Sequence, residues 1–262
     1  MLKSPKNLGV IHFIGIGGIG MSGIAEILFQ SGYNVQGSDI SNSNNTIRLR
    51  KLGIKVFIGQ KKSNIINAKI IVVSTAISEI NKEYVAAKKM FLPIVHRAEM
   101  LGELMRLKQS IAIAGTHGKT TTTSLIAKMI EENGMDPTII NGGIISSLNS
   151  NAKLGNGEWM VVEADESDGS FAKLNPTVAI ITNIDLEHLD YHKSEENLEK
   201  AFFQFVSSIP FYGFVCLCID HPRTQKLISK LQNKKVITYG LSANADISCL
   251  LYTSDAADEC SG

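Results

Sequence analysis

Short apolar runs alternate along the chain with longer segments whose apolar positions recur at helical spacing. Buried strands are predicted for the apolar runs at residues 9–14, 33–38, 70–74, 111–114, 159–163, 177–182, 214–219 and 235–239. Helices are predicted for residues 21–30, 83–90, 99–108 and 119–132, and for the segments after Ser194 and near Pro222. This alternation favours an α/β fold with parallel sheets and helices on both faces.

The pattern divides into two α/β units in series. The helical segment at residues 99–108 leads directly into the strand at Ile111, so we place a domain boundary near Lys108. Residues 1–107 are predicted to form a Rossmann-like domain with a parallel sheet, and residues 108–248 a P-loop ATPase-type α/β domain. In the helix at 119–132 the residues expected on one apolar side are Leu125, Ile126, Met129 and Ile130.

Composition limits the classes of partner. The 262 residues are 44% hydrophobic and carry 26 Lys plus Arg against 25 Asp plus Glu, so the net charge gives no reason to expect nucleic acid or a membrane as partner. No apolar stretch approaches the roughly 20 residues that span a bilayer, and a cytoplasmic location is expected. Buried thiols are favoured over a zinc site for the cysteines, which are Cys216, Cys218, Cys249 and Cys260.

The segment at residues 111–123 predicts a phosphate-binding loop between a strand and a helix. Its Gly-Thr-His-Gly-Lys-Thr sequence is a shortened P-loop, because Ile113 stands at the first glycine position of G-x-x-x-x-G-K-[ST]. Backbone N–H groups and Lys119 would bind ATP phosphates, and Thr120 would place its hydroxyl on Mg²⁺. The predicted ATP-binding residues are Gly115, Thr116, His117, Gly118, Lys119, Thr120 and Thr121.

A second glycine turn precedes this loop. Gly15, Gly17 and Gly20 have the G-x-G-x-x-G spacing after a strand, and Asp39 follows the next strand. Alone, this motif would suggest a nicotinamide-dependent oxidoreductase. Combined with an ATP-type loop, it favours an enzyme that joins a nucleotide-carried substrate to ATP-driven chemistry; a non-catalytic nucleotide-binding module is a further alternative.

Two polar clusters follow predicted strands in the second unit. Glu163 begins the sequence Glu-Ala-Asp-Glu-Ser-Asp, where a carboxylate could hold Mg²⁺ rather than form a solvated acidic loop. His188 lies beside Glu187 and Asp190 and could ligate a second metal, although a histidine in a loop is usually only a hydrogen-bonding residue.

These motifs together resemble the Mur ligase family of ATP-dependent acid–amine ligases of peptidoglycan precursor synthesis. The resemblance rests on Gly-Thr-His-Gly-Lys-Thr-Thr, Glu-Ala-Asp-Glu-Ser-Asp and Thr-Asn-Ile-x-x-x-His-x-Asp. Within the family, residues 12–23, 37–39, 74–77 and 96–105 resemble the branch that adds L-alanine to UDP-N-acetylmuramate. The branch that recycles murein tripeptide is the alternative. Phe202 stands where several sister ligases have a carbamylated lysine, which suits the alanine-adding branch.

The resemblance implies roles for individual residues. Lys119, Glu163 and His188 would be catalytic, and Thr120, Glu163 and His188 would hold Mg²⁺. His117 would face the substrate side of its loop. The residues implied to bind the UDP-sugar are Gly15, Gly17, Gly18, Ile19, Gly20, Asp39, Ser74, Thr75 and Ala76.

The resemblance also implies a reaction and a missing part. The γ-phosphoryl group of ATP would activate the lactyl carboxylate of UDP-N-acetylmuramate as an acyl phosphate, which L-alanine would attack. The family has a third, C-terminal domain that this chain does not reach. The similarity ends near Ile247, so residues 249–262 are expected to be a non-native tail, with a divergent natural terminus as the alternative. An isolated fragment of this kind is expected to be inactive in ligation.

Overall fold

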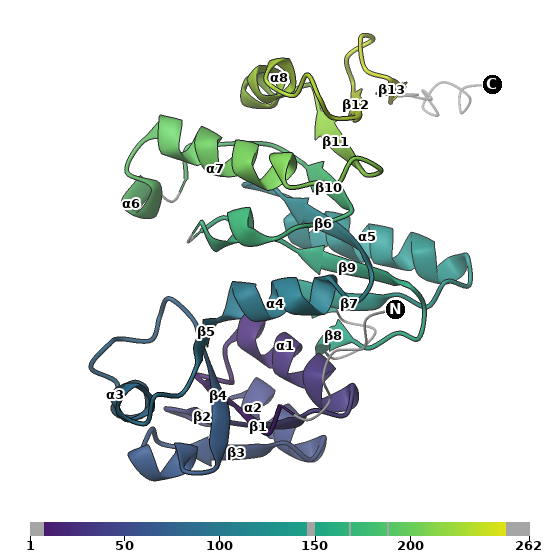
Figure 1. Cartoon of the computed structure of the whole chain (residues 1–262). Helices are drawn as coiled ribbons and strands as arrows, with labels where there is room; N and C mark the ends of the chain where they lie inside the picture. The colour runs from purple at the N-terminus through teal and green to yellow at the C-terminus, as the bar shows by residue number, and fades with distance from the viewer. Residues whose placement is uncertain (1–7, 146–149, 168, 188, 250–262) are drawn as a thin grey trace, which may run out of the picture.

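The computed structural model describes residues 8–145, 150–167, 169–187 and 189–249, which form two sheets with surrounding helices (Figure 1). The first sheet has five parallel strands in the order β3-β2-β1-β4-β5. Its strands are β1 (Val10–Ile14), β2 (Asn34–Asp39), β3 (Lys55–Ile58), β4 (Ala68–Val73) and β5 (Ile94–His96). Its helical segments are α1 (Ile19–Gln30), α2 (Asn44–Lys51), η1 (Lys62–Ile65), α3 (Lys82–Lys89) and α4 (Arg97–Met105).

The second sheet has eight strands in the order β13-β12-β11-β10-β6-β9-β7-β8. Neighbouring strands are parallel except for β7 and β8. The strands are β6 (Gln109–Ala114), β7 (Thr138–Ile145), β8 (Ser150–Lys153), β9 (Trp159–Glu163), β10 (Val178–Ile181), β11 (Phe214–Cys218), β12 (Val236–Gly240) and β13 (Ile247–Ser248). The helical segments are α5 (Lys119–Glu132), η2 (Ser170–Lys173), α6 (Leu189–His192), α7 (Glu195–Ser207) and α8 (Pro222–Ser229).

Local sequence signals fix several helix starts. Ser43 and Thr46 form a capping box at the start of α2, and Asn81 caps α3 by accepting from two backbone N–H groups. Ser194 caps α7 by accepting from the backbone N–H of Asn197, and Pro222 stands at the first position of α8. These side chains replace hydrogen bonds that the first turn of a helix cannot make internally.

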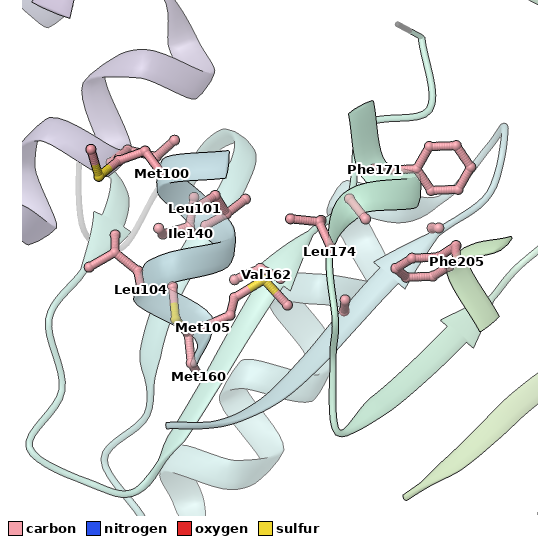
Figure 2. Close-up of a cluster of buried hydrophobic side chains, with 14 of the residues drawn as sticks. Met100, Leu101, Leu104, Met105, Ile140, Met160, Val162, Phe171, Leu174 and Phe205 are labelled. Atoms are coloured by element: carbon pink, nitrogen blue, oxygen red, sulfur yellow. The ribbon is translucent and has the colours of Figure 1, made fainter. Parts of the chain in front are cut away.

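Helix α4 lies between the two sheets (Figure 1), and its buried side chains share one hydrophobic cluster with residues of the second sheet. Figure 2 shows Leu101, Leu104 and Met105 of this helix facing Ile140 of β7 and Met160 of β9, all of them at most 7% exposed. Burying a large apolar side chain stabilises a fold by about 1.5–3 kcal/mol. The last helix of the first unit therefore contributes to the core of the second.

The predicted α/β fold, with a Rossmann-like sheet followed by a P-loop type sheet, is confirmed. The expected apolar side of α5 is wrong in part, because Leu125 is 60% and Met129 66% exposed. The stripe that faces the sheet is instead Thr123, Ile126, Ala127 and Ile130, which also has helical spacing. Small and hydroxyl-bearing residues took places that the sequence pattern gave to larger ones.

Several elements were not predicted individually, among them α2, β3, β5, β7 and β8. The predicted domain boundary at residues 107/108 precedes β6, and it stays a prediction. The tail at 249–262 lies outside the described residues, apart from Cys249. Among the helices that the structure describes, none combines the length and the apolar character that crossing a membrane requires.

Candidate active site between the two sheets

The carboxyl ends of β6, β9 and β10 meet at one edge of the second sheet, since these strands are adjacent and parallel. The predicted ATP loop follows β6, Glu163 ends β9, and Thr182 and Asn183 follow β10. Open α/β sheets bind ligands at this edge. The topology thus brings together residues as far apart in the chain as His117 and Asn183, which are separated by 66 positions.

The loop after β10 holds the ATP loop by a set of hydrogen bonds. The backbone N–H of His117 donates to Asn183 Oδ1 at 2.8 Å, and the hydroxyl of Thr182 donates to the carbonyl of His117 at 2.7 Å. Gly115 has a φ of 133°, and a Cβ there would overlap the Thr182 hydroxyl. Glycine is therefore required at position 115 both by backbone conformation and by the close approach of the neighbouring loop.

Lys119 bends back over its own loop. Its ammonium group donates to the carbonyls of Gly115 at 2.6 Å and Thr116 at 3.0 Å, and it lies 2.9 Å from Glu166 Oε1. Glu166 is buried, and this burial raises its pKa, although the Lys119 ammonium acts in the opposite direction. The loop thus carries a cation whose counter-ion is a buried carboxylate from the Glu-Ala-Asp-Glu-Ser-Asp motif.

Thr120 and Glu163 come together as predicted. The hydroxyl of Thr120 donates to Glu163 Oε2 at 2.9 Å, and the N–H of Gly142 donates to the same oxygen at 2.8 Å. Among the described residues no group of three His, Cys, Asp or Glu side chains could hold a metal by itself. One hydroxyl and one carboxylate oxygen nevertheless fit Mg²⁺, which usually takes one or two protein oxygens together with phosphate oxygens and water. His188 lies outside the described residues.

An ion-pair cluster flanks the loop that the sequence motifs identified. His117 Nε2 lies 3.4 Å from Asp185 Oδ2 and 3.6 Å from Glu187 Oε1. The other oxygen of Asp185, Oδ1, accepts from Nε2 of His221, which precedes α8, at 3.0 Å. Sequence analysis did not single out Asp185 or His221; the only available signal was their position directly after predicted strands.

The first glycine turn is closed by its neighbouring strand. The N–H groups of Gly15 and Ile16 donate to the carbonyl of Ser38 at 2.8 and 2.9 Å, and the N–H of Gly17 donates to Asp39 Oδ2 at 2.8 Å. A Cβ on Gly17 would lie within 3.0 Å of atoms of Asp39 and of the α2 start. Asp39 therefore shapes the turn in addition to the predicted contact with a nucleotide, which stays a prediction.

Two cavities connect this turn to Glu163. One of about 540 Å³ is lined by Gly15, Gly17 and Asp39, and a second of about 410 Å³ lies between the sheets and reaches Glu163. The two share four lining residues, namely Gly18, Met21, Ser74 and Ala76. Every residue predicted to bind a UDP-sugar lines one cavity or the other: Gly15, Gly17, Gly18, Ile19, Gly20, Asp39, Ser74, Thr75 and Ala76.

A buried polar network that the sequence did not predict lies beneath the first turn. Glu83 of α3 is fully buried and accepts from the Ser38 hydroxyl at 2.5 Å and from Asn64 at 2.6 Å, while His12 Nε2 lies 3.3 Å away. Burial opposes ionisation of this carboxyl, but the hydrogen bonds from His12, Ser38 and Asn64 hold its pKa below the ordinary value. Because Ser38 also accepts from Gly15, the network supports the turn.

A second polar cluster joins the two units. Asn151 of β8 is fully buried, donates to the carbonyl of Ile19 at 2.6 Å and accepts from Arg48 at 2.8 Å. Arg48 also lies 2.6 Å from Glu26 Oε2 on α1. The first turn of α1 is thereby fixed against the second sheet, and hence against the ATP loop.

Comparison with known proteins agrees with this architecture. Residues 10–109 match the family model described as "Mur ligase family, catalytic domain", and residues 113–258 match "Mur ligase middle domain". The chain is 55% identical over 256 residues to the UDP-N-acetylmuramate–L-alanine ligase of Brucella anthropi. The aligned region covers 98% of this chain and 55% of that protein. The chain spans about half the length of the curated relatives it matches.

Two solved structures are similar as well. The UDP-N-acetylmuramate-alanine ligase of Thermotoga maritima matches with a TM-score of 0.79 at 33% identity, over 88% of this chain and 52% of that one. The UDP-N-acetylmuramate:L-alanyl-γ-D-glutamyl-meso-diaminopimelate ligase of Neisseria meningitides matches with a TM-score of 0.82 at 25% identity, over 88% and 78%. From its fold, its paired glycine turns and these matches, the chain belongs to the Mur ligase family.

Proposed function

We propose that the protein represented by this chain ligates L-alanine to the lactyl carboxylate of UDP-N-acetylmuramate, with ATP as the activating substrate, in peptidoglycan precursor synthesis. The observation that carries the proposal is the pair of joined cavities running from the first glycine turn to Glu163. Relatives 55–58% identical to the chain bear the name of this activity. Because the chain belongs to the Mur ligase family, the alternative that it is a nicotinamide-dependent oxidoreductase has no support.

The first turn supplies the site for the nucleotide sugar. Gly18 is the N-cap of α1, and the opening turn of this helix leaves N–H groups without intrahelical partners at the cavity wall. Such N–H groups and the helix dipole favour a diphosphate. With the diphosphate there, the sugar acid would extend through the second cavity toward Glu163.

The second loop supplies the site for ATP. A free carboxylate cannot expel oxide, so it must first be activated, and transfer of the γ-phosphoryl group gives an acyl phosphate that an amine can attack. Lys119 offsets negative charge on the phosphates during this transfer. Thr120 and Glu163 would hold Mg²⁺, which when bound supplies further electrostatic stabilisation of phosphate oxygens.

Three further parts complete the proposal. His188 is proposed as a further Mg²⁺ ligand and catalytic residue, following the resemblance of its motif. The proposed partners are UDP-N-acetylmuramate, ATP and L-alanine, and the proposed location is the bacterial cytoplasm, where such precursors are made. Residues 1–107 and 108–248 are proposed as the UDP-sugar and ATP domains, with residues 249–262 as a tail.

A second candidate is ligation of a murein tripeptide to the same sugar acid. The structural match to the Neisseria meningitides ligase, with its TM-score of 0.82, favours it. Identity favours L-alanine, because that match is 25% identical and the alanine-ligase relatives are 55–58% identical. ADP release by the complete protein with L-alanine or with tripeptide as the amine separates the two candidates.

Calorimetric titration of this chain with UDP-N-acetylmuramate and with NAD, in the presence of Mg²⁺, tests the nucleotide-sugar site. Saturable binding of the UDP-sugar alone is the expected result. Binding of NAD instead would support the alternative that the protein is a nicotinamide-dependent oxidoreductase. If neither ligand binds, circular dichroism decides between an unfolded chain and a wrong assignment of the site.

A further inference from the structure

We propose that Arg97 binds the carboxylate of the sugar acid in the cavity between the two sheets. This inference rests on the proposed function and names a substrate-binding residue for it. Arg97 is the first residue of α4, its side chain is 16% exposed, and it lines the cavity of about 410 Å³ that also reaches Glu163. Its position is fixed by both units, because its guanidinium Nη2 lies 2.7 Å from Asp165 Oδ2.

The guanidinium lies directly against the first turn of α1. A Cβ placed on Gly20 would be 2.9 Å from Arg97 Nη1, so the glycine at this position makes room for the arginine. The N–H groups that open α1 border the same cavity. Two sources of positive potential, the helix N-terminus and a full cationic charge, therefore meet where an anionic substrate would lie.

The charge balance of the cavity requires such a cation. The described residues that line it include the carboxylates Glu163 and Asp165, and Arg97 is the one lysine or arginine among them. Lys119 serves the other loop and is bonded to Glu166. Without Arg97, a substrate carboxylate brought to this cavity would meet two acidic side chains and no neighbouring cationic one.

The guanidinium group suits this task by its shape. It has five N–H donors in a plane, so a single guanidinium can bind the Asp165 carboxylate and a substrate carboxylate together. Asp165 is 41% exposed at its side chain, so the pair stands at the cavity wall and is reachable from it. Charge-assisted, two-pronged hydrogen bonds of this kind also orient the carboxylate for phosphoryl transfer.

The test compares two ligands by calorimetry on the 262-residue chain. UDP-N-acetylmuramate has the lactyl carboxylate, whereas UDP-N-acetylglucosamine has the same nucleotide diphosphate and lacks it. Arg97→Ala is expected to weaken binding of UDP-N-acetylmuramate about 30-fold, as for loss of a hydrogen-bonded charge pair, and binding of UDP-N-acetylglucosamine less than about 3-fold. Arg97→Lys, which keeps the charge and loses the planar fork, is expected to fall between Ala and the unmodified chain.

Asp165→Asn separates substrate binding from a structural role. It neutralises the Asp165 carboxylate beside Arg97 but keeps the cation, so affinity for UDP-N-acetylmuramate is expected to hold or rise. If Arg97→Ala weakens the affinity for both ligands equally, Arg97 contacts the diphosphate and the inference is overturned. If Arg97→Ala and Asp165→Asn weaken the affinity for UDP-N-acetylmuramate equally, Arg97 has only a structural role in its ion pair with Asp165. If the unmodified chain is folded by circular dichroism and still binds neither UDP-sugar, the proposed function itself fails.

Discussion

The two glycine turns that are proposed to bind phosphates have the same order of strand, turn and helix, yet only the second contains a cationic side chain. The turn after β1 has no cation of its own and is closed by Asp39 and by the carbonyl of Ser38. The loop after β6 contains Lys119, which bonds to two loop carbonyls and to the buried Glu166. The turn proposed for a diphosphate thus relies on backbone N–H groups, whereas the loop proposed for a triphosphate carries its own cation.

The largest expected effect is a loss of stability on substitution of a glycine in the loop after β6. Gly115→Ala should lower the free energy of unfolding by about 3 kcal/mol, because the φ of 133° is unfavourable for alanine and its methyl group would overlap Thr182. Gly118→Ala is the matched control: its φ is 79°, no atom lies within 4 Å of the added Cβ, and about 1 kcal/mol is expected. Urea unfolding measures both. Equal losses would mean that the contact with Thr182 does not matter.

The next largest effect is a loss of affinity for one ligand, ATP, without a loss for the other, the UDP-sugar. Lys119→Ala should weaken ATP binding about 100-fold, since a charge-assisted contact to phosphate is lost, and should leave affinity for UDP-N-acetylmuramate unchanged. Acyl-phosphate formation should be abolished in the complete protein. Lys128→Ala on the same helix, where the lysine is exposed and paired with Glu132, serves as control. Retained ATP affinity in Lys119→Ala would contradict the role of the loop cation.

A smaller effect concerns the junction that sets the turns against each other. Asn151→Ala should cost about 2 kcal/mol of stability, because the buried carbonyl of Ile19 and the Arg48 guanidinium each lose a hydrogen-bond partner. The exposed Asn67→Ala should change stability little. Thermal unfolding of both variants checks this. A loss as small as that of Asn67→Ala would mean that the polar cluster does not hold the units together.

The smallest effect lies beneath the first turn and depends on pH. The folded-state pKa of Glu83 is below its ordinary value of 4.5, so its ionised form adds stability above about pH 4.5, and this stability is lost as the pH falls through the folded pKa. Glu83→Gln should cost about 1 kcal/mol at neutral pH and flatten the acid limb of the stability curve. Glu79→Gln, 81% exposed at its side chain, is the control. An unchanged acid limb in Glu83→Gln would contradict this.

Sequence periodicity and glycine spacing were sufficient for the fold class, and the motifs also indicated which segments would meet at the edge of the second sheet. The pairing of Thr120 with Glu163 followed from two motifs at the ends of neighbouring strands, because parallel topology brings such ends together. The strands from β9 to β12 and the helix after Ser194 also lie where apolar spacing predicted them. Strong local patterns of this kind depend little on the rest of the fold.

Features that depend on contacts between distant segments could not be predicted. Arg97 and Asp165 are 68 positions apart, and nothing in either local sequence indicates their ion pair. Leu125 and Met129 were expected on the buried side of α5, but spacing alone does not decide which of two adjacent helix faces meets the sheet. His12 lies inside an apolar run, and nothing in the local sequence indicated that it joins a buried network with Glu83.

The packing of α4 has a consequence for the order in which the protein can fold during synthesis. The helix ends at Met105, but the apolar partners that cover it, Ile140, Met160 and Val162, leave the ribosome later. The nascent first domain therefore presents an uncovered apolar helix until β9 has emerged. In this interval the polypeptide is most exposed to aggregation and to chaperone binding, and a pause in translation between residues 105 and 162 would lengthen it.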